Sequence, residues 1–245
     1  MQLSKISTRA PKSFDKEKTK LQTTILVDEI SELQNILYAQ GKYKVLIILQ
    51  GMDASGKDGA IKAVFKGINP LGCSVKAFKA PNTEEQGYDF LWRIHKNVPE
   101  KGMIKIFNRS QYEDILVPTV HKLLPTEIIE KRYKHINQFE EFLVDNDTII
   151  LKFYLHISKE EQTQRLQERV TDYKKFWKHN DQDAKEAKLW NNYMKVYERI
   201  FKDCNKAAPW QIIPADQNWY KEYLIAKSIV ESLKGLKLSY NKKST

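Results

Sequence analysis

Apolar and polar residues follow one another along this chain in blocks that predict alternating strands and helices. Short apolar runs typical of strands occur at residues 45–49, 74–78, 103–107, 148–155 and 210–213. Between them, apolar residues recur every three or four positions, the period of a helix with one buried face. This period predicts helices over residues 14–40, 88–96, 126–145, 184–205 and 218–234. It predicts two more, one from the loop after the first strand to about residue 69 and one that begins at residue 158. Strands that alternate with helices indicate an α/β fold, a five-stranded parallel sheet with helices on both faces.

The apolar period lapses around residues 172–183, where the chain is strongly basic. A solvated pair of helices would explain this composition. The alternative is a mobile basic lid, over about 165–185, which closes on phosphates and excludes water. We predict one domain over residues 1–245, with an N-terminal helix at about 14–40, this lid, and a frayed lysine-rich tail from Lys237.

A phosphate-binding loop follows the first apolar run. The segment VLIILQGMDASGKD, Val45 to Asp58, places Gly51, four residues, then Gly56 and Lys57 between a strand and a helix. This spacing fits the P-loop pattern, with Asp58 where serine or threonine is usual. The glycines let the backbone turn several N–H groups toward one anion, and the following helix adds the positive end of its dipole.

Asp53 and Asp58 place two carboxylates in a loop built to hold anions. They would repel a phosphate chain unless a cation lay between them, and Mg²⁺ binds phosphates through one or two carboxylates and several waters. The alternative for either residue is a structural one, because an acid at the start of a helix is favoured as a cap.

Two further strand ends carry polar side chains that can meet a ligand. In open α/β sheets, ligands bind beyond the carboxyl ends of the strands. The second strand ends in the polar loop Lys79–Glu85, and the third in Asn108-Arg109-Ser110, where P-loop proteins usually carry an acid. Glu113 and Asp114 follow closely and can supply that charge, while Arg109 suits a phosphate clamp or, alternatively, a solvated strand end.

Composition narrows the choice of partners. A net charge of +10 attracts polyanions, which include nucleic acid, anionic lipid and phosphate-rich small molecules. No apolar run approaches a membrane span, no leader is apparent, and the two cysteines match no metal or redox spacing, so we expect a cytoplasmic protein. The chain lacks an N-K-x-D sequence, which argues against a GTPase, and the parts described so far predict a phosphoryl transferase.

Several motifs, in order, resemble the polyphosphate kinase 2 family. They are GMDASGKDG, FNRSQYEDILV from Phe107, LKFYLHISKEEQ from Leu151, and APW with IPADQNW between Ala208 and Trp219. The resemblance extends from about Ser13 to Leu233. It implies a thymidylate-kinase-like P-loop kinase fold with a helical lid, Mg²⁺ as cofactor, and reversible transfer of the terminal phosphate of inorganic polyphosphate to a nucleoside mono- or diphosphate.

The motifs and the resemblance together assign roles to residues. Asp53, Lys57, Arg109 and Glu113 are the expected catalytic residues, and Asp53, Asp58 and Glu113 the expected metal ligands. The expected phosphate-binding residues are Gly51, Ala54, Ser55, Gly56, Lys57, Asp58, Gly59, Lys62, Lys66, Arg165, Arg169, Lys175 and Lys178. The expected nucleotide contacts are Lys79, Asn82, Asn108, Arg109 and Glu113.

One departure from the family concerns the third strand. Much of the family has Asp-Arg-Ser with Tyr-Asn-Arg, whereas this chain has Asn108-Arg109-Ser110 with Tyr112-Glu113-Asp114. This form resembles the branch that phosphorylates both AMP and ADP. It leaves open whether Glu113 binds metal or nucleotide.

The predicted partners are therefore polyphosphate and ADP, AMP or ATP, without nucleic acid or membrane, in a homodimer or homotetramer. Two alternatives stay open at this stage. One is an ATP-dependent nucleoside or nucleotide kinase, which needs the same parts. The other is a basic nucleic-acid-binding protein with a decayed P-loop, although the aromatic residues have core periodicity and no binding motif is recognised.

Overall fold

The structure, a computed structural model, describes residues 2–240. Its centre is a five-stranded sheet in the order β2-β3-β1-β4-β5, and every pair of neighbours is parallel. The strands are β1 Lys44–Gln50, β2 Cys73–Ala77, β3 Ile104–Asn108, β4 Thr148–His156 and β5 Trp210–Pro214. All five strands predicted from the sequence are confirmed, each to within about two residues at its ends.

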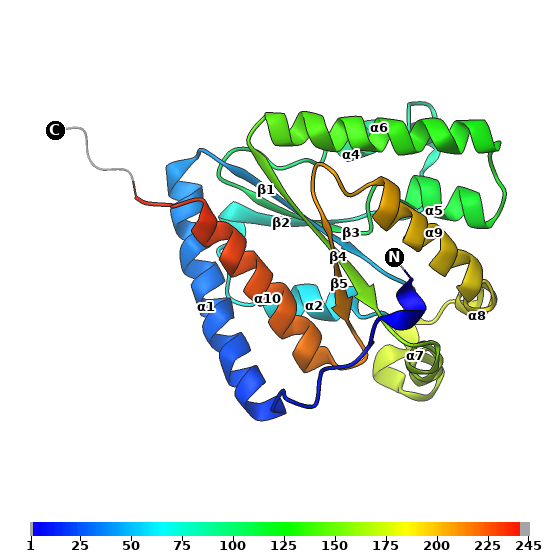
Figure 1. The fold of residues 1–245 in the computed structure, drawn as a ribbon, viewed down its shortest axis with the longest axis horizontal. Helices are drawn as coiled ribbons and strands as arrows, with labels where there is room; N and C mark the ends of the chain where they lie inside the picture. Colours follow the sequence, from blue (N-terminus) through cyan, green and yellow to red (C-terminus); the bar gives the residue numbers. More distant parts are fainter. Residues whose placement is uncertain (1, 241–245) are drawn as a thin grey trace.

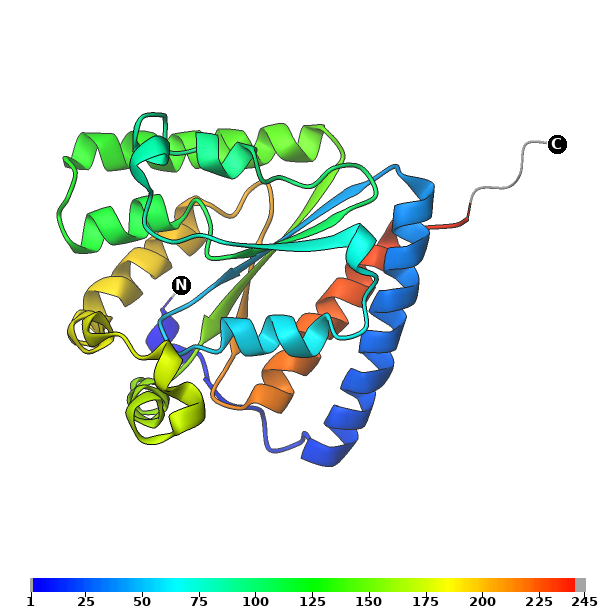
Figure 2. The same cartoon turned by 180° about the vertical axis from the view of Figure 1, so that it is seen from behind.

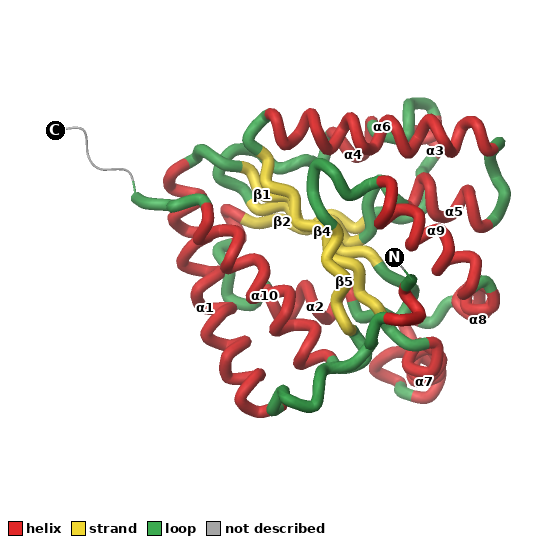
Figure 3. The backbone as a smooth tube through the Cα atoms, in the orientation of Figure 1, coloured by secondary structure: helices red, strands yellow, loops and turns green. Residues whose placement is uncertain are grey.

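Helices cover both faces of this sheet (Figures 1 and 3). On one face lie α1 Lys16–Gln40, α2 Lys57–Val64 and α10 Asn218–Gly235, and on the other α5 Glu113–Val120, α6 Thr126–Asp145 and α9 Trp190–Asp203. Strand β1 shows why the two layers form: Val45, Ile47 and Leu49 pack into one core, and Leu46 and Ile48 into the other. Since successive side chains of a strand point to opposite faces, a run that is apolar at every position must be covered on both.

The predicted N-terminal helix is confirmed as α1. Asp15 lies one residue before it, where its carboxylate accepts a hydrogen bond from the Lys18 N–H, and Gly41 ends it in the left-handed conformation (φ 61°). Both ends follow from residue type, because aspartate satisfies free N–H groups and glycine adopts positive φ without strain. The helix packs along α10, which closes the chain on the same face.

Helix α5 was not predicted from the sequence. It is short, its apolar residues are consecutive rather than spaced at the helical period, and Pro118 lies inside it. Proline cannot donate to the carbonyl four residues earlier. Here that carbonyl, of Asp114, accepts a hydrogen bond from the Arg132 guanidinium at 2.7 Å instead, so the helix tolerates the proline.

Several predicted helices have different limits. Helix α2 ends at Val64 rather than near Asn69, and the predicted helix 88–96 is only α4 Trp92–His95. The stretch predicted as one helix over 184–205 is two, α8 Asp181–Lys188 and α9, because Leu189 departs from helical geometry (φ −88°, ψ 11°). A short helix, α3 Thr83–Gln86, interrupts the loop predicted after β2.

The predicted lid corresponds to the end of α7 Lys159–Thr171, the 3-10 turn η3 Tyr173–Lys178 and the start of α8. This part lies beyond the arrowheads of the strands, beside the N-terminal end of the chain (Figures 1 and 2). Two further 3-10 turns, η1 Leu3–Lys5 and η2 Pro70–Gly72, complete the elements. Within residues 2–240, every helix is too short or too polar to cross a bilayer. The predicted frayed tail falls largely on residues 241–245, outside the described residues.

Candidate active site

The P-loop connects the end of β1 to the start of α2. Gly51 and Gly56 adopt φ values of 153° and 90°, which residues with side chains rarely adopt. A β-carbon on Gly51 would lie 2.9 Å from the Leu155 carbonyl oxygen, so any larger residue would push the loop away from β4. The two glycines of the pattern are therefore required by the backbone path itself.

Lys57 is buried beneath this loop. Its ammonium group donates to the carbonyl oxygens of Gly51, at 2.7 Å, and Met52, at 3.2 Å. Burial, together with the positive charge of Arg109, lowers the pKa of Lys57 to about 8. A phosphate beside this ammonium would favour its charged form and raise the pKa again.

Arg109 and two carboxylates form the centre of the site. At the end of β3, Arg109 adopts a left-handed conformation (φ 64°), fixed by its N–H bond to the Leu49 carbonyl at 3.0 Å. Its guanidinium donates to the Asp53 carboxylate at 2.6 Å. Although burial alone would raise the pKa of Asp53, the charges of Arg109 and Lys57 outweigh it and lower that pKa, so Asp53 is ionised.

Glu113 faces the same cluster from the first turn of α5. Burial raises its pKa, and the charges of Arg109 and Lys57 offset this only in part. For Arg109 the balance is opposite: burial lowers its pKa, but Glu113 and Asp53 outweigh burial and raise it. The guanidinium thus stays charged between two carboxyl groups.

Asp58 lies at the outer rim rather than at this centre. Its carboxylate accepts a hydrogen bond from the Asn108 amide at 2.6 Å and lies 3.9 Å from the Lys178 ammonium of the lid. The residue that replaces the usual serine or threonine therefore connects the P-loop both to the end of β3 and to the lid.

The basic residues of the lid are held by internal partners. Arg169 pairs with Asp183 at 2.6 Å, and Lys175 with Glu168 at 2.6 Å. Arg165 uses its guanidinium differently, because it donates to the carbonyl oxygens of Ala54, Ala215 and Asp216 and to the Glu161 carboxylate. Arg165 thereby ties the P-loop to the end of β5.

Two cavities meet at the Asp53–Arg109 pair. The larger, about 570 Å³, lies between the P-loop and the lid, and the smaller, about 150 Å³, between the P-loop, α5, α8 and α9. Asp53 and Arg109 line both. The larger cavity is rich in lysine and arginine, whereas the smaller adds apolar Leu116 and Val117 to polar groups.

Most residues expected to form the site lie around these cavities. Around the larger are Asp53, Ala54, Ser55, Gly56, Lys57, Asp58, Gly59, Lys79, Asn108, Arg109, Arg165, Arg169, Lys175 and Lys178; Gly51 and Glu113 line the smaller. Asn82 lines neither and instead caps α3, its side chain accepting from the Glu85 N–H at 2.8 Å. Lys62 and Lys66, exposed on α2 and just after it, line neither cavity either. The roles expected for these three residues stay predictions.

Sequence reasoning missed several residues of the site. Lys221 of α10 is buried and bonds to the Gly56 carbonyl at 3.3 Å, beneath the P-loop. Burial and the charge of Arg165 lower the pKa of Lys221 to about 8. Nothing in its local sequence marks it, because it is one lysine in a helix far along the chain. The other residues missed include Trp177, Asn180, Asp183 and Asn218 around the larger cavity and His121, Glu186, Tyr193 and Tyr197 around the smaller.

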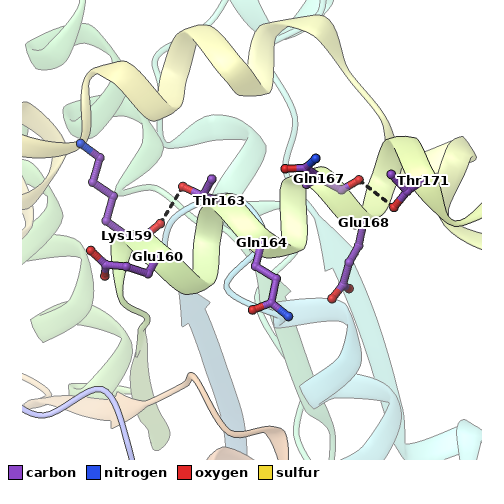
Figure 4. Close-up of a pocket in the computed structure, with 7 residues that line it drawn as sticks. All are labelled: Lys159, Glu160, Thr163, Gln164, Gln167, Glu168 and Thr171. Atoms are coloured by element: carbon purple, nitrogen blue, oxygen red, sulfur yellow. Dashed lines mark hydrogen bonds between the residues drawn. The ribbon is translucent and has the colours of Figure 1, made fainter.

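The outer face of α7 forms a further shallow groove, which shares Glu168 with the larger cavity (Figure 4). Its side chains come from that one helix, and two of them, Thr163 and Thr171, bond back to carbonyls of the same helix. The residues are Lys159, Glu160, Thr163, Gln164, Gln167, Glu168 and Thr171. With acids and amides beside a single lysine, this face does not have the character of a phosphate site.

The carboxylates at the centre of the site fit Mg²⁺. Across residues 2–240, no three His, Cys, Asp or Glu side chains converge enough to hold a metal alone. Mg²⁺ does not require this, since it is usually held by one or two carboxylates, substrate phosphates and water. Asp53, which is ionised and lines the same cavity as Glu113, suits that role at the centre of the site. Asp58 lies at the outer rim, with one oxygen bonded to Asn108 and the other 3.9 Å from Lys178.

A P-loop after the central strand, an arginine at the end of the neighbouring strand and a basic helical lid together define a P-loop phosphotransferase. A comparison with family models gives the narrower class: residues 13–241 match the model of polyphosphate kinase 2. The chain belongs to the polyphosphate kinase 2 family, as the resemblance of its motifs predicted.

Two named relatives and a solved structure agree with this assignment. The AMP/ADP-polyphosphate phosphotransferase of Meiothermus ruber is 47% identical, over 90% of this chain and 83% of that protein. The ADP-polyphosphate phosphotransferase of Rhodopseudomonas palustris is 40% identical, over 87% of this chain and 78% of that protein. The crystal structure of polyphosphate kinase 2 from Arthrobacter aurescens matches with a TM-score of 0.96 and 36% identity, over all of this chain and 89% of that one.

Proposed function

We propose that this chain transfers the terminal phosphoryl group of inorganic polyphosphate to ADP or AMP, reversibly and with Mg²⁺. The observation that carries the proposal is that two cavities of different character share Asp53 and Arg109. A transfer between two substrates needs one point at which both meet. The names of the Meiothermus and Rhodopseudomonas relatives support the choice of polyphosphate and adenine nucleotides.

The larger cavity suits the phosphate chain. It is lined by P-loop residues and by more cationic side chains than carboxylates, as a ligand with about one negative charge per phosphate requires. At its inner end, Lys57 and Arg109 can hold the terminal phosphoryl group. Such preorganised charges stabilise the transition state more than the ground state when they point at the oxygens on which charge develops.

The smaller cavity suits part of the acceptor nucleotide. Leu116 and Val117 provide apolar contact, and Glu186, His121 and Tyr193 provide polar groups at a distance from the phosphates. In this arrangement a terminal phosphate oxygen of ADP attacks the end phosphorus of the chain. One P–O bond forms, the bond to the next phosphate breaks, and the shortened chain leaves with the electron pair of that bond.

The protein groups position the two substrates and exclude water. Asp53 and Glu113 would hold Mg²⁺, which, when bound, neutralises charge on the phosphate oxygens. Arg165 attaches the start of the lid to the P-loop through the Ala54 carbonyl, and Arg169 lines the same cavity from within the lid, where it pairs with Asp183. A closed lid would limit hydrolysis of the donor. Asp58, Lys62, Lys66, Lys79, Asn82 and Asn108 keep the metal, phosphate or nucleotide roles expected of them as part of this proposal.

The decisive experiment supplies polyphosphate as the sole donor. We expect the purified protein to form ATP from ADP, polyphosphate and Mg²⁺, and to form ADP and then ATP from AMP, measured by chromatography over time. If no nucleotide is phosphorylated unless ATP is added, the ATP-dependent kinase is the correct function instead. Glu160→Gln, an exposed residue on the outer face of α7 that lines neither cavity, is the control for variants of the lid and should retain the wild-type rate.

The division between the cavities has its own test. Lys178→Ala should raise the KM for polyphosphate and leave the KM for ADP within about twofold of the wild type. Tyr193→Phe should raise the KM for ADP and leave the KM for polyphosphate within about twofold. If both variants change the same KM, the two substrates do not occupy the cavities as proposed. The homodimer or homotetramer and the cytoplasmic location stay predictions, which light scattering and cell fractionation can test.

A further inference from the structure

A charged network lies buried under the segment that carries Arg109 and Glu113. Lys152 of β4 is 0% exposed and Glu140 of α6 is 1% exposed, and their charged groups are 2.6 Å apart. They belong to the α6 and α9 side of the sheet, and neither lines one of the two cavities. Neither residue contacts a substrate in the proposed reaction.

The remaining hydrogen bonds of this pair go to Tyr112, Gln111 and the Cys204 carbonyl. Glu140 accepts hydrogen bonds from the Tyr112 hydroxyl, at 2.6 Å, and from the Gln111 amide, at 3.0 Å. Lys152 donates to the Tyr112 hydroxyl oxygen at 3.0 Å and to the Cys204 carbonyl at 2.9 Å. Tyr112 directly precedes Glu113, and Gln111 lies two residues after Arg109. The network therefore binds the segment that connects Arg109 to Glu113.

Stability alone does not explain this arrangement. Removing two charges from water is so unfavourable that a buried ion pair can often be replaced by apolar residues of similar size with no loss of stability. A buried pair whose polar atoms are all engaged does, however, fix the groups that bond to it. Here those groups are the side chains of Gln111 and Tyr112.

Arg109 requires such support. Its φ of 64° is uncommon for a residue with a β-carbon, and strained conformations of this kind persist only where the surroundings enforce them. At the carboxyl ends of β1 and β3, the Arg109 N–H donates to the Leu49 carbonyl and the Gln50 amide donates to the Ser110 hydroxyl at 3.2 Å. The bonds of Gln111 and Tyr112 to Glu140 hold the residues that directly follow Ser110 in the same turn.

We propose that Lys152 and Glu140 are positioning residues, which act through Tyr112 and Gln111 to hold Arg109 and Glu113 in the geometry of phosphoryl transfer. The inference rests on the proposed function, in which Arg109 and Glu113 contact the reacting groups. It predicts an effect on the rate of transfer that is separable from stability and from substrate binding.

Tyr112→Phe is the first test, because it removes one hydroxyl and leaves the Lys152–Glu140 pair intact. We expect a folded protein whose kcat for ATP formation falls about 10- to 100-fold, the effect of a small misplacement of catalytic groups. The KM for polyphosphate and for ADP should change less than twofold. Hydrogen–deuterium exchange should become faster in residues 109–116 and stay unchanged in the P-loop.

Tyr133→Phe is the matched control. Tyr133 is also a buried tyrosine of the α6 side, and its hydroxyl has no hydrogen-bond partner among the described residues. This variant should retain the wild-type kcat and the wild-type exchange in residues 109–116. It separates loss of a bond to Glu140 from loss of a hydroxyl in this core.

A triple variant, Tyr112→Phe with Glu140→Leu and Lys152→Met, replaces the network by apolar side chains. We expect its Tm to be no lower than that of Tyr112→Phe and its kcat to be no higher. A wild-type kcat in either Tyr112→Phe or a folded triple variant overturns the inference, as does unchanged exchange in residues 109–116. If the wild-type protein makes no ATP from polyphosphate, the proposed function fails, whereas the exchange experiment still tests whether the network positions the segment.

Discussion

Replacing Arg109 by glycine should separate catalysis from stability more cleanly than any other single change at this site. Arg109 carries the charge that both cavities share, and it occupies a backbone conformation that glycine adopts readily (φ 64°). Removing the side chain therefore deletes a charge that the proposed function assigns to catalysis, and it also relieves backbone strain. Arg109→Ala deletes the same charge but retains the strain.

The structure gives the size of each effect. The Arg109 and Asp53 side chains are 37% and 26% exposed, so their ion pair contributes only about 0.2–1 kcal/mol to stability. A β-carbon in the left-handed region costs roughly 1–2 kcal/mol. Arg109→Gly should thus be more stable than Arg109→Ala by about 1 kcal/mol, and close to the wild type. For a chain of this size, that difference corresponds to roughly 2–4 °C in Tm.

Both variants should lose activity alike. Removal of one preorganised charge contact lowers kcat about 10²- to 10³-fold, roughly 2.7–4 kcal/mol of transition-state stabilisation. ATP formation from ADP and polyphosphate, followed by a coupled luminescence assay, measures kcat, and thermal unfolding measures Tm. The reasoning is refuted if either variant retains kcat within threefold of the wild type, or if Arg109→Ala is as stable as Arg109→Gly.

Lys122 offers a matched control for the strain. It too has a positive φ, 54°, and it is exposed between α5 and α6, outside both cavities. Lys122→Gly should be more stable than Lys122→Ala by a similar amount, about 1 kcal/mol. Neither change should alter kcat, which would show that relief of strain alone does not affect the reaction.

Three further outcomes are expected. Lys57→Ala should lower kcat/KM by a factor that corresponds to about 3 kcal/mol or more, while gel filtration and Tm show a folded protein; near wild-type turnover would remove Lys57 from the mechanism. Since the pKa of Lys57 is lowered to about 8, kcat/KM for polyphosphate should fall as pH rises through about 8, and kcat should fall only at higher pH because bound phosphate favours the charged lysine. A pH profile in which both parameters are flat from pH 7 to 9 would contradict this. Asp53→Asn should abolish activity and weaken Mn²⁺ binding measured by electron paramagnetic resonance; unchanged Mn²⁺ affinity would exclude Asp53 as a metal ligand.

The same lysine links pH to stability with a definite sign. Its folded-state pKa of about 8 lies below the usual 10.5, so between these values the unfolded chain binds more protons than the folded one. Stability gains from this group as pH rises through that window, because the cost of burying the ammonium disappears once it is neutral. Activity and this contribution to stability therefore change in opposite directions above pH 8.

The parts of the fold that could be predicted are those determined by local sequence. The central strand is apolar at every position because both faces are covered, and the P-loop glycines are required by the path of the backbone, so both are visible in the sequence alone. Asp15 and Gly41 likewise mark the ends of α1 through their own conformational preferences. In contrast, α5 contains Pro118, which leaves the Asp114 carbonyl without its helical hydrogen bond. Arg132 of α6 donates to that carbonyl, and the local sequence of α5 does not reveal this contact.

In the site, too, contacts between residues distant in the sequence could not be predicted. The resemblance predicted phosphate contacts for Arg165 and Arg169, and both residues line the larger cavity with the P-loop. No motif reveals that the Arg165 guanidinium donates to backbone carbonyls. Lys221 lines the larger cavity because α10 packs beside α2 and the P-loop, and Glu186 lines the smaller because α8 lies near α5 and α9. Their positions depend on tertiary packing, which leaves no spacing or motif in the sequence.

The cations of the larger cavity are paired with groups of the protein itself, and this has consequences for binding. Arg109 bonds to Asp53, Arg169 to Asp183 and Lys175 to Glu168, while Lys178 lies near Asp58. A phosphate chain that enters would compete with these carboxylates for the four cations, whereas Lys57 and Lys221 are bonded to backbone carbonyls instead. In the proposed reaction, this exchange would moderate affinity, free Asp53 to hold a metal next to the transferred group, and shift lid residues from internal partners to the substrate. We therefore propose that binding of the chain, assembly of the metal site and closure of the lid are parts of one rearrangement of ion pairs.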